Sequence, residues 1–127
     1  MISGTFWGPD FNNPVNQQFV DEFEKKYNRI PSQYAAQSYD AALLLDSAIA
    51  QGQGQRRATS RRSWPRSRPR TSRALRGNFK FNNNNFPIQD MYVFEVAKDA
   101  KGRVSLKTLG APLKDHQDAY HAQCTLK

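Results

Sequence analysis

The sequence predicts an α/β fold in which two helices are followed by a β-hairpin or meander and a short C-terminal helix. Three observations predict it: an apolar stripe at helical spacing over residues 14–27, a run of small and apolar residues after Ser32, and alternating, strand-like segments beyond residue 76. The chain has 127 residues, enough for one domain, and its hydrophobic fraction of 38% is low for that length.

The first helix is predicted over residues 14–27, after a short strand or turn at 5–7. Asn13 can cap it, and Pro14 suits the first helical position because proline lacks the N–H that a helix start leaves unpaired. Acids and lysines occupy one side of the predicted helix. The apolar side is formed at four-residue spacing by Val15, Phe19, Phe23 and Tyr27.

A second helix is predicted from Ser32, which can cap it, to about Ala50. A connector over residues 28–31 separates it from the first helix, and Gly52 and Gly54 end it. Because the body of this helix is rich in small and apolar residues, we expect it to be buried on more than one side.

Residues 55–75 interrupt this pattern, since they are rich in Arg, Ser and Pro and have no apolar period. Such a composition predicts a disordered, basic segment. Nine arginines and no acid lie between Arg56 and Arg76, which leaves ten Lys and Arg (19 − 9) against eleven acids elsewhere, a net of −1. The formal charge of +8 therefore belongs to this segment. We divide the chain into a helical part (1–54), this aberrant segment (55–75), and a β-rich part with a tail (76–127).

The β-rich part contains three predicted strands joined by turns. Residues 82–85 and 98–102 carry the Asn, Asp and Gly residues that favour turns. Pro112 is expected to end the unit, and residues 115–124 are expected to form a short polar helix or tail. The strands are predicted at 78–81, 91–97 and 103–108.

Membrane insertion, secretion by a signal peptide and enzymatic activity have no support in the sequence. No run of 18 apolar residues exists, so no membrane span is predicted. Residues 1–7 lack a basic and an apolar region, so we expect no signal peptide and, for the chain as written, a cytoplasmic location. There is no P-loop, no GxGxxG and no serine nucleophile motif.

No metal or other cofactor is predicted. His116, His121 and Cys124 lie near one another in the sequence, but their spacing is not that of a structural zinc site and a fourth ligand is missing. Cys124 is the only cysteine, so an intrachain disulfide is impossible, and we expect an inert thiol.

Ligand-binding candidates are Tyr34, Tyr39 and Asp40, all on the second predicted helix. These side chains could face a ligand cleft, where a tyrosine ring would pack on the ligand. The alternative is core packing with the hydroxyl groups hydrogen-bonded.

A different reading makes the chain a small basic nucleic-acid-binding protein. The arginines of Arg56–Arg76 could contact phosphates, and Trp64 could stack on a base. We expect instead a solvated, non-native basic run without a specific nucleic-acid partner.

Several strings of residues in the same order resemble one family. They begin with FWGPDFNNP at 6–14 and are most specific at YAAQSYDAA, 34–42; RGNFKFN at 76–82 and PIQD at 87–90 follow. Together they resemble the C-terminal part of periplasmic solute-binding proteins of the branched-chain amino acid (Leu/Ile/Val-type) ABC-transporter family. The resemblance covers both flanks, 1–50 and 76–127, and not the segment between them.

The resemblance implies a partial type I periplasmic-binding-protein fold. In that family two doubly wound α/β lobes close on a small amino acid or another small carboxylate and deliver it to an inner-membrane ABC permease, without a cofactor. It implies a periplasmic location and a chain, 1–127, that supplies only C-terminal elements. The residues that grip the ligand's charged groups come mostly from earlier segments, so binding by this chain alone is not expected.

The aberrant segment has the composition expected of a shifted reading frame. The family has a helix where residues 55–74 lie. Suppose that each new codon takes the third base of one codon and the first two bases of the next. Its central base is then the first base of the next original codon, which is T for tryptophan and for serine codons of the TCN type. Codons with a central T encode apolar residues. These positions are spaced i, i+3, i+4, i+7, and one permitted codon choice converts residues 59–74 into DLATLMAAIEAADFKS, an amphipathic helix. They are Ser60, Ser63, Trp64 and Ser67.

Overall fold

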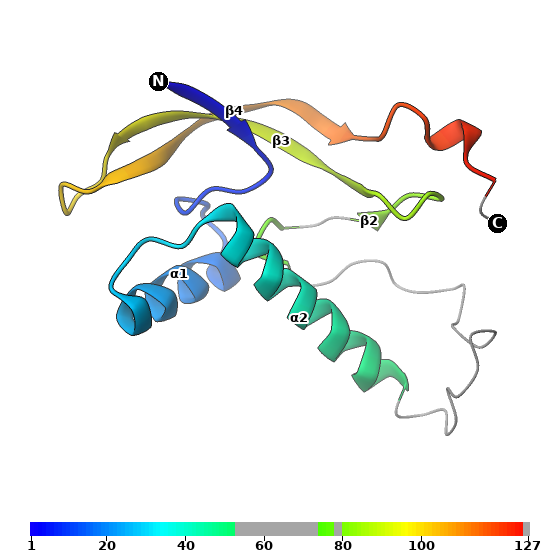
Figure 1. Cartoon of the computed structure of the whole chain (residues 1–127), viewed down its shortest axis with the longest axis horizontal. Helices are drawn as coiled ribbons and strands as arrows, with labels where there is room; N and C mark the ends of the chain where they lie inside the picture. Colours follow the sequence, from blue (N-terminus) through cyan, green and yellow to red (C-terminus); the bar gives the residue numbers. More distant parts are fainter. Residues whose placement is uncertain (53–73, 78–79, 126–127) are drawn as a thin grey trace.

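The computed structural model describes residues 1–52, 74–77 and 80–125 (Figure 1). The predicted disorder of the aberrant segment lies outside the described residues as far as residue 73. For its last two residues the prediction is wrong, because Ala74 and Leu75 are ordered and are 2% and 0% exposed.

Helix α1 (Pro14–Tyr27) has the predicted bounds. The Oδ1 atom of Asn13 accepts a hydrogen bond from the backbone N–H of Val15 at 3.0 Å, which pairs one of the donors that a helix start leaves free. At the other end Asn28 adopts the left-handed conformation, with φ of 52°, and its N–H donates to the carbonyl of Glu24 at 2.8 Å. Both ends of α1 are thus fixed by local residues.

Helix α2 (Gln33–Gly52) begins after Ser32, as predicted, and ends within two residues of the expected position. Its expected burial on more than one side is wrong. Ala36 and Asp40 are buried, but Tyr34 is 71% exposed and Leu45 is 60% exposed. Only one side of α2 is therefore buried, and its C-terminal half projects away from the sheet (Figure 1).

A four-stranded sheet lies above the two helices (Figure 1). Its central strand is β3 (Pro87–Lys98), which pairs antiparallel with β1 (Ile2–Thr5), β2 (Lys80–Phe81) and β4 (Val104–His116). The combination of two helices and an antiparallel sheet confirms the predicted α/β fold.

The predicted turns of the β-rich part are confirmed. Between β3 and β4 the N–H of Asp99 donates to the carbonyl of Arg103, and Gly102 has a φ of 75°, which glycine adopts without steric cost. Between β2 and β3 the N–H of Asn85 donates to the carbonyl of Asn82. Of the predicted strand at 78–81, β2 contains the last two residues, and 78–79 lie outside the described residues.

Four strand and tail bounds differ from the predicted ones. β3 begins at Pro87, four residues before the predicted start at 91. β1 ends at Thr5, so the expected strand at 5–7 is displaced toward the N-terminus, where residues 2–5 pair with β3. β4 continues through Pro112 and does not end before it. Of the expected helix or tail at 115–124, only His121–Gln123 forms a helical turn, of the 3-10 type, and β4 continues to His116.

The hydrophobic core lies between the helices and the sheet. Phe11, in the loop before α1, contacts the rings of Tyr92 and Phe94 on β3, with ring centroids 4.5 Å and 6.2 Å away. Phe94 is fully buried. The buried members of the main cluster are Trp7, Phe19, Ala36 and Leu75.

Candidate functional site

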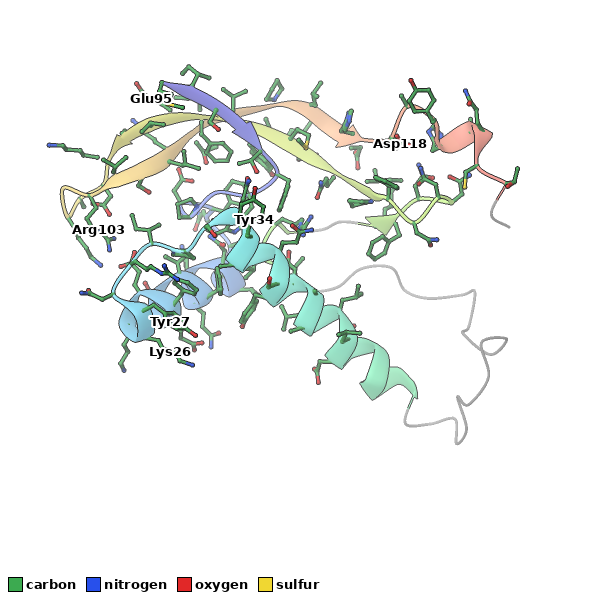
Figure 2. The ribbon with its side chains drawn as sticks, in the orientation of Figure 1. Lys26, Tyr27, Tyr34, Glu95, Arg103 and Asp118 are labelled. Atoms are coloured by element: carbon green, nitrogen blue, oxygen red, sulfur yellow. The ribbon has the colours of Figure 1, made fainter. Side chains whose placement is uncertain are left out.

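The three predicted ligand-binding residues occupy different environments on α2. Tyr34, in the first turn, projects into solvent (Figure 2). Tyr39 packs its ring against Phe19 of α1, with ring centroids 4.8 Å apart. Asp40 is 4% exposed. The structure therefore does not bring the three side chains together at one surface.

Asp40 is the centre of a buried polar network. Its Oδ1 accepts the backbone N–H of Leu75 at 2.7 Å, and its Oδ2 accepts Nε of Arg76 at 2.9 Å. Arg76 in turn donates from Nη1 to Oε1 of Gln89 at 2.5 Å. The network ties α2 to the segment 74–77 and to β3, and it satisfies a carboxylate that would otherwise be costly to bury.

Arg76 is the residue of this network that the sequence did not single out. Its guanidinium also lies over the ring of Phe6, 4.4 Å from the centroid. In the sequence Arg76 is the last of nine arginines, so its charge appeared to belong to the basic segment. The preceding arginines, 56–73, lie outside the described residues, and the nucleic-acid reading gains no support from the part of the chain that is described.

A second buried network fixes the loop between β1 and α1. The indole Nε1 of Trp7 donates to Oδ1 of Asn16 at 2.6 Å, and both residues are almost fully buried. The amide nitrogen of Asn16 donates to the carbonyls of Gly8, Pro9 and Phe11 at 3.3–3.4 Å. One asparagine side chain thus holds the loop that carries Phe11 against the sheet.

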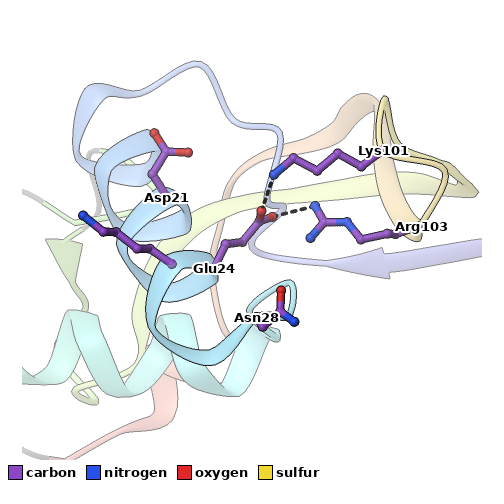
Figure 3. Close-up of a pocket in the computed structure, with 6 residues that line it drawn as sticks. Asp21, Glu24, Asn28, Lys101 and Arg103 are labelled. Atoms are coloured by element: carbon purple, nitrogen blue, oxygen red, sulfur yellow. Dashed lines mark hydrogen bonds and ion pairs between the residues drawn. The ribbon is translucent and has the colours of Figure 1, made fainter.

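An open depression of about 410 Å³ lies between the end of α1 and the β3–β4 turn. Arg103 and Lys101 both point at the carboxylate of Glu24, at 2.8 and 2.7 Å (Figure 3). Hydrogen bonds from Arg103 and Lys101 hold the pKa of Glu24 below its ordinary value. The depression is lined by polar and charged side chains only: Asp21, Glu24, Lys25, Asn28, Lys101 and Arg103.

This depression differs from a typical small-molecule site, which is mostly apolar with a few polar groups. Lys101 and Arg103 both pair with Glu24, so these three side chains link α1 to the β3–β4 turn. Arg103, in the turn that precedes β4, also bonds Asp99 at 2.7 Å, and its side chain lies on the side of the hairpin that faces α1 (Figure 2). We therefore interpret the cluster as a structural contact.

In the described part of the chain, no group of three or more His, Cys, Asp or Glu residues is close enough to hold a metal ion. Cys124 carries a free thiol. No described helix is long and apolar enough to cross a membrane.

Comparison with known proteins identifies the fold. A family model described as a periplasmic binding protein matches residues 1–102. The structure is similar to the crystal structure of an ABC-transporter solute-binding protein from R. palustris in complex with benzoate, with a TM-score of 0.68 and 25% sequence identity. The similarity covers 94% of this chain and 31% of that one, so the chain spans about a third of the length of that relative. No curated protein sequence matches.

Both findings define the class as solute-binding proteins. The chain belongs to the periplasmic binding protein family. The family and the structural neighbour consist of proteins that bind solutes, and the neighbour works with an ABC transporter.

Proposed function

We propose that the chain supplies the C-terminal elements of the solute-binding component of an ABC transporter for small carboxylates. The match to the periplasmic binding protein family over residues 1–102 carries this proposal. The ligand is a branched-chain or related amino acid, or another small carboxylate, and the partner is a permease in the inner membrane. The protein acts in the periplasm by binding and release, without a cofactor and without chemical catalysis.

The ligand class rests on a group that both candidate ligands share. Leucine-type amino acids and benzoate each carry one carboxylate beside an apolar body. Benzoate is bound by the R. palustris protein whose fold this chain resembles. The two ligands differ in the ammonium group, which needs an acidic partner. Asp40 is a poor candidate for that partner because it already pairs with Arg76.

The two tyrosines and the aspartate predicted as ligand-binding residues have separate roles in this proposal. Tyr34, whose side chain is 71% exposed, offers its ring to the apolar body of the ligand. Tyr39 and Asp40 set the position of α2, through Phe19 and Arg76 respectively. Tyr34 is therefore the contact residue and the other two position it.

Binding by the chain alone is not expected in this proposal. A solute-binding protein closes two lobes around its ligand, and most of the grip on the charged groups comes from segments that precede the part matched here. The open depression at the end of α1 is also unlike a site for a small carboxylate, because its lining is polar and charged and its residues Glu24, Lys101 and Arg103 already pair with one another.

Titration calorimetry of the chain with benzoate and with L-leucine tests this proposal. We expect no binding heat with either ligand at millimolar concentration. Micromolar binding of either would contradict the claim that the cleft is incomplete, and turnover of either ligand would contradict a purely binding role.

A further inference from the structure

The turn between β2 and β3 holds the C-terminal tail, which we define as residues 117–125. The tail follows β4 and passes beside this turn (Figure 1). Nδ2 of Asn82 donates to Oε1 of Gln117 at 3.0 Å, and Nδ2 of Asn84 donates to Oδ2 of Asp118 at 2.7 Å. These contacts join positions 35 and 34 residues apart in the sequence, so a distant part of the chain binds the tail.

The amide groups of Asn82 and Asn84 each bridge the turn and the tail. While their nitrogens donate to the tail, their oxygens accept backbone N–H groups of the turn. Oδ1 of Asn82 accepts the N–H of Asn83 at 2.8 Å, and Oδ1 of Asn84 accepts that of Phe86 at 3.2 Å. Because the amide group is planar, the bond to its oxygen also sets the direction of its nitrogen. The turn must therefore be formed for both nitrogens to reach the tail.

The backbone of the tail is folded where the turn holds it. Nδ2 of Asn83 donates to the carbonyl of His121 at 2.8 Å. The N–H of His121 donates to the carbonyl of Asp118 at 3.2 Å, and the N–H of Gln123 donates to that of Tyr120 at 3.0 Å. A single 3-10 turn of this kind is too short to be stable by itself. The side chains of the β2–β3 turn therefore contribute to its order.

Strand β2 gains from the same contacts. It has two residues, Lys80 and Phe81, which pair with Ile88 and Pro87 of β3. A ladder of two pairs is much shorter than the usual strand of about five residues, so it adds little stability. The bonds to the tail hold the turn that β2 enters, so they also keep β2 against β3.

We propose that the tail is a strap closed on the β2–β3 turn, and that strap, turn and β2 open and close as one unit while the rest of the sheet stays formed. Cooperative local units of this kind occupy the low-stability end of a fold. The ion pair of Asp40 and Arg76 lies outside this unit, so the helices stay attached to the sheet when the strap opens. The strap is independent of the proposed transport function.

Asn84→Asp tests the strap in the full chain. The variant keeps the oxygen that the turn uses, but it replaces the nitrogen that donates to Asp118 by an oxygen and places two carboxylates side by side. Amide hydrogen exchange, measured by NMR, reports on the N–H of Asn82, which donates to the carbonyl of Phe86, and on that of Gln123 in the tail. Protection of both N–H groups should fall about fivefold or more, through one lost hydrogen bond and a like-charge contact.

Two further variants assign this effect to the bond between the turn and the tail. The double variant Asn84→Asp, Asp118→Asn exchanges donor and acceptor, so it should restore protection at both N–H groups. Asn85→Asp makes the same change one residue later, at an exposed side chain that donates to no tail atom among the described residues, and should leave both unchanged. Neither Asn82 nor Gln123 adjoins a substituted residue, so their intrinsic exchange rates stay the same.

The N–H of Val96, which donates to the carbonyl of Met1 at 2.9 Å, checks that the sheet is formed in each variant. Unchanged protection of Gln123 in Asn84→Asp would overturn the proposal, since the tail would then not depend on the turn. Failure of the double variant to restore protection, or an equal loss in Asn85→Asp, would assign the effect to added charge and overturn it too. So would an equal loss at Val96, because strap and turn would then not open apart from the sheet.

Discussion

Asp40 and Arg76 lie 36 positions apart in the sequence and form an ion pair of 2.9 Å whose side chains are 4% and 10% exposed. Asp40 belongs to α2, and Arg76 precedes β2 and reaches Gln89 of β3. The pair therefore joins the helical part of the chain to the β-rich part on the far side of residues 53–73. The two stretches that resemble the family, 1–50 and 76–127, are therefore in direct contact through this pair.

Removing one partner of this pair should destabilise the fold strongly. Arg76→Leu leaves the buried Asp40 carboxylate without its cation and should lower the free energy of unfolding by about 3 kcal/mol, measured by urea denaturation. In a double-mutant cycle with Asp40→Asn, the two losses should be less than additive by about 1 kcal/mol or more. Lys114→Ala is the control, because this lysine's pair with Asp90 is exposed and should contribute under about 1 kcal/mol. Additive losses would contradict the pairing.

The Asn16 network should be equally sensitive. Asn16→Ala removes the acceptor of the buried indole N–H of Trp7 and the side-chain donor to the carbonyl of Pro9, while the carbonyls of Gly8 and Phe11 keep backbone N–H donors. The variant should cost about 2 kcal/mol of unfolding free energy. Gln17→Ala, one residue later, removes an exposed contact with Asn12 and should change stability by under about 0.5 kcal/mol. Equal midpoints in urea for the two variants would rule out a structural role for Asn16.

Gly8 should tolerate no side chain. A Cβ atom there would collide with the ring of Phe94 and lie 2.9 Å from Oδ1 of Asp10. We expect Gly8→Ala to cost about 2 kcal/mol, measured by thermal unfolding, and to cost less in a Phe94→Leu background, where the ring is absent. Gly110→Ala is the control, since a Cβ there meets nothing within 4 Å. If the two alanine variants unfold at the same temperature, the close approach of Gly8 to Phe94 is not present.

The link between α1 and the β3–β4 turn should weaken in acid. The pKa of Glu24 is lowered below its unfolded value of 4.5, first by the hydrogen bond from Arg103 and then by that from Lys101. A lowered folded-state pKa stabilises the fold above the unfolded value, and this stabilisation is lost as the pH falls through the folded value. Unfolding free energy should therefore fall below about pH 4.5.

Glu24→Gln should flatten that acid dependence, and the exposed neighbour Glu22→Gln should leave it unchanged. Asp90 and Asp99 also have lowered pKa values, so part of the slope should remain in Glu24→Gln. The measurement is the free energy of unfolding in urea between neutral and acidic pH. If it falls equally in acid for the wild type and for Glu24→Gln, the contacts of Arg103 and Lys101 with Glu24 do not form.

The two helices could be predicted because their signals are local. Asn13 and Pro14 mark the start of α1, and the apolar spacing up to Tyr27 marks its extent. Ser32 likewise marks the start of α2, where its Oγ accepts the N–H of Ala35 at 3.4 Å. Each signal acts within a few residues, so the fold of the rest of the chain does not alter it.

Strand ends depend on pairing and could not be predicted in the same way. Pro112 was expected to end a strand, but it lies in β4, which among the described strands pairs only with β3. Between the pairs Val93–Gly110 and Met91–Leu113, two steps along β3 correspond to three along β4, and Pro112 sits in that bulge. Proline is tolerated at edges and bulges because no ladder hydrogen bond is lost there.

The C-terminal segment was predicted as a short polar helix or tail, and its path after β4 is set by hydrogen bonds from side chains distant in the sequence. Asn82 donates to Gln117 at 3.0 Å, Asn83 to the carbonyl of His121 at 2.8 Å, and Asn84 to Asp118 at 2.7 Å. The candidate site could be predicted only in part for the same reason. The charge of Arg76 is evident from the sequence, but its pairing with Asp40 depends on the tertiary fold.

The most direct test of the central claim, that this chain is part of a solute-binding protein, is complementation. The tagged chain would be co-expressed with the part of the R. palustris benzoate-bound protein that lacks the matched third, and benzoate binding would be measured on the purified material. We predict that the two parts co-purify in equal amounts and bind benzoate, whereas neither does so alone. Failure of the two folded parts to co-purify, or a complex that binds no small carboxylate, would contradict the account.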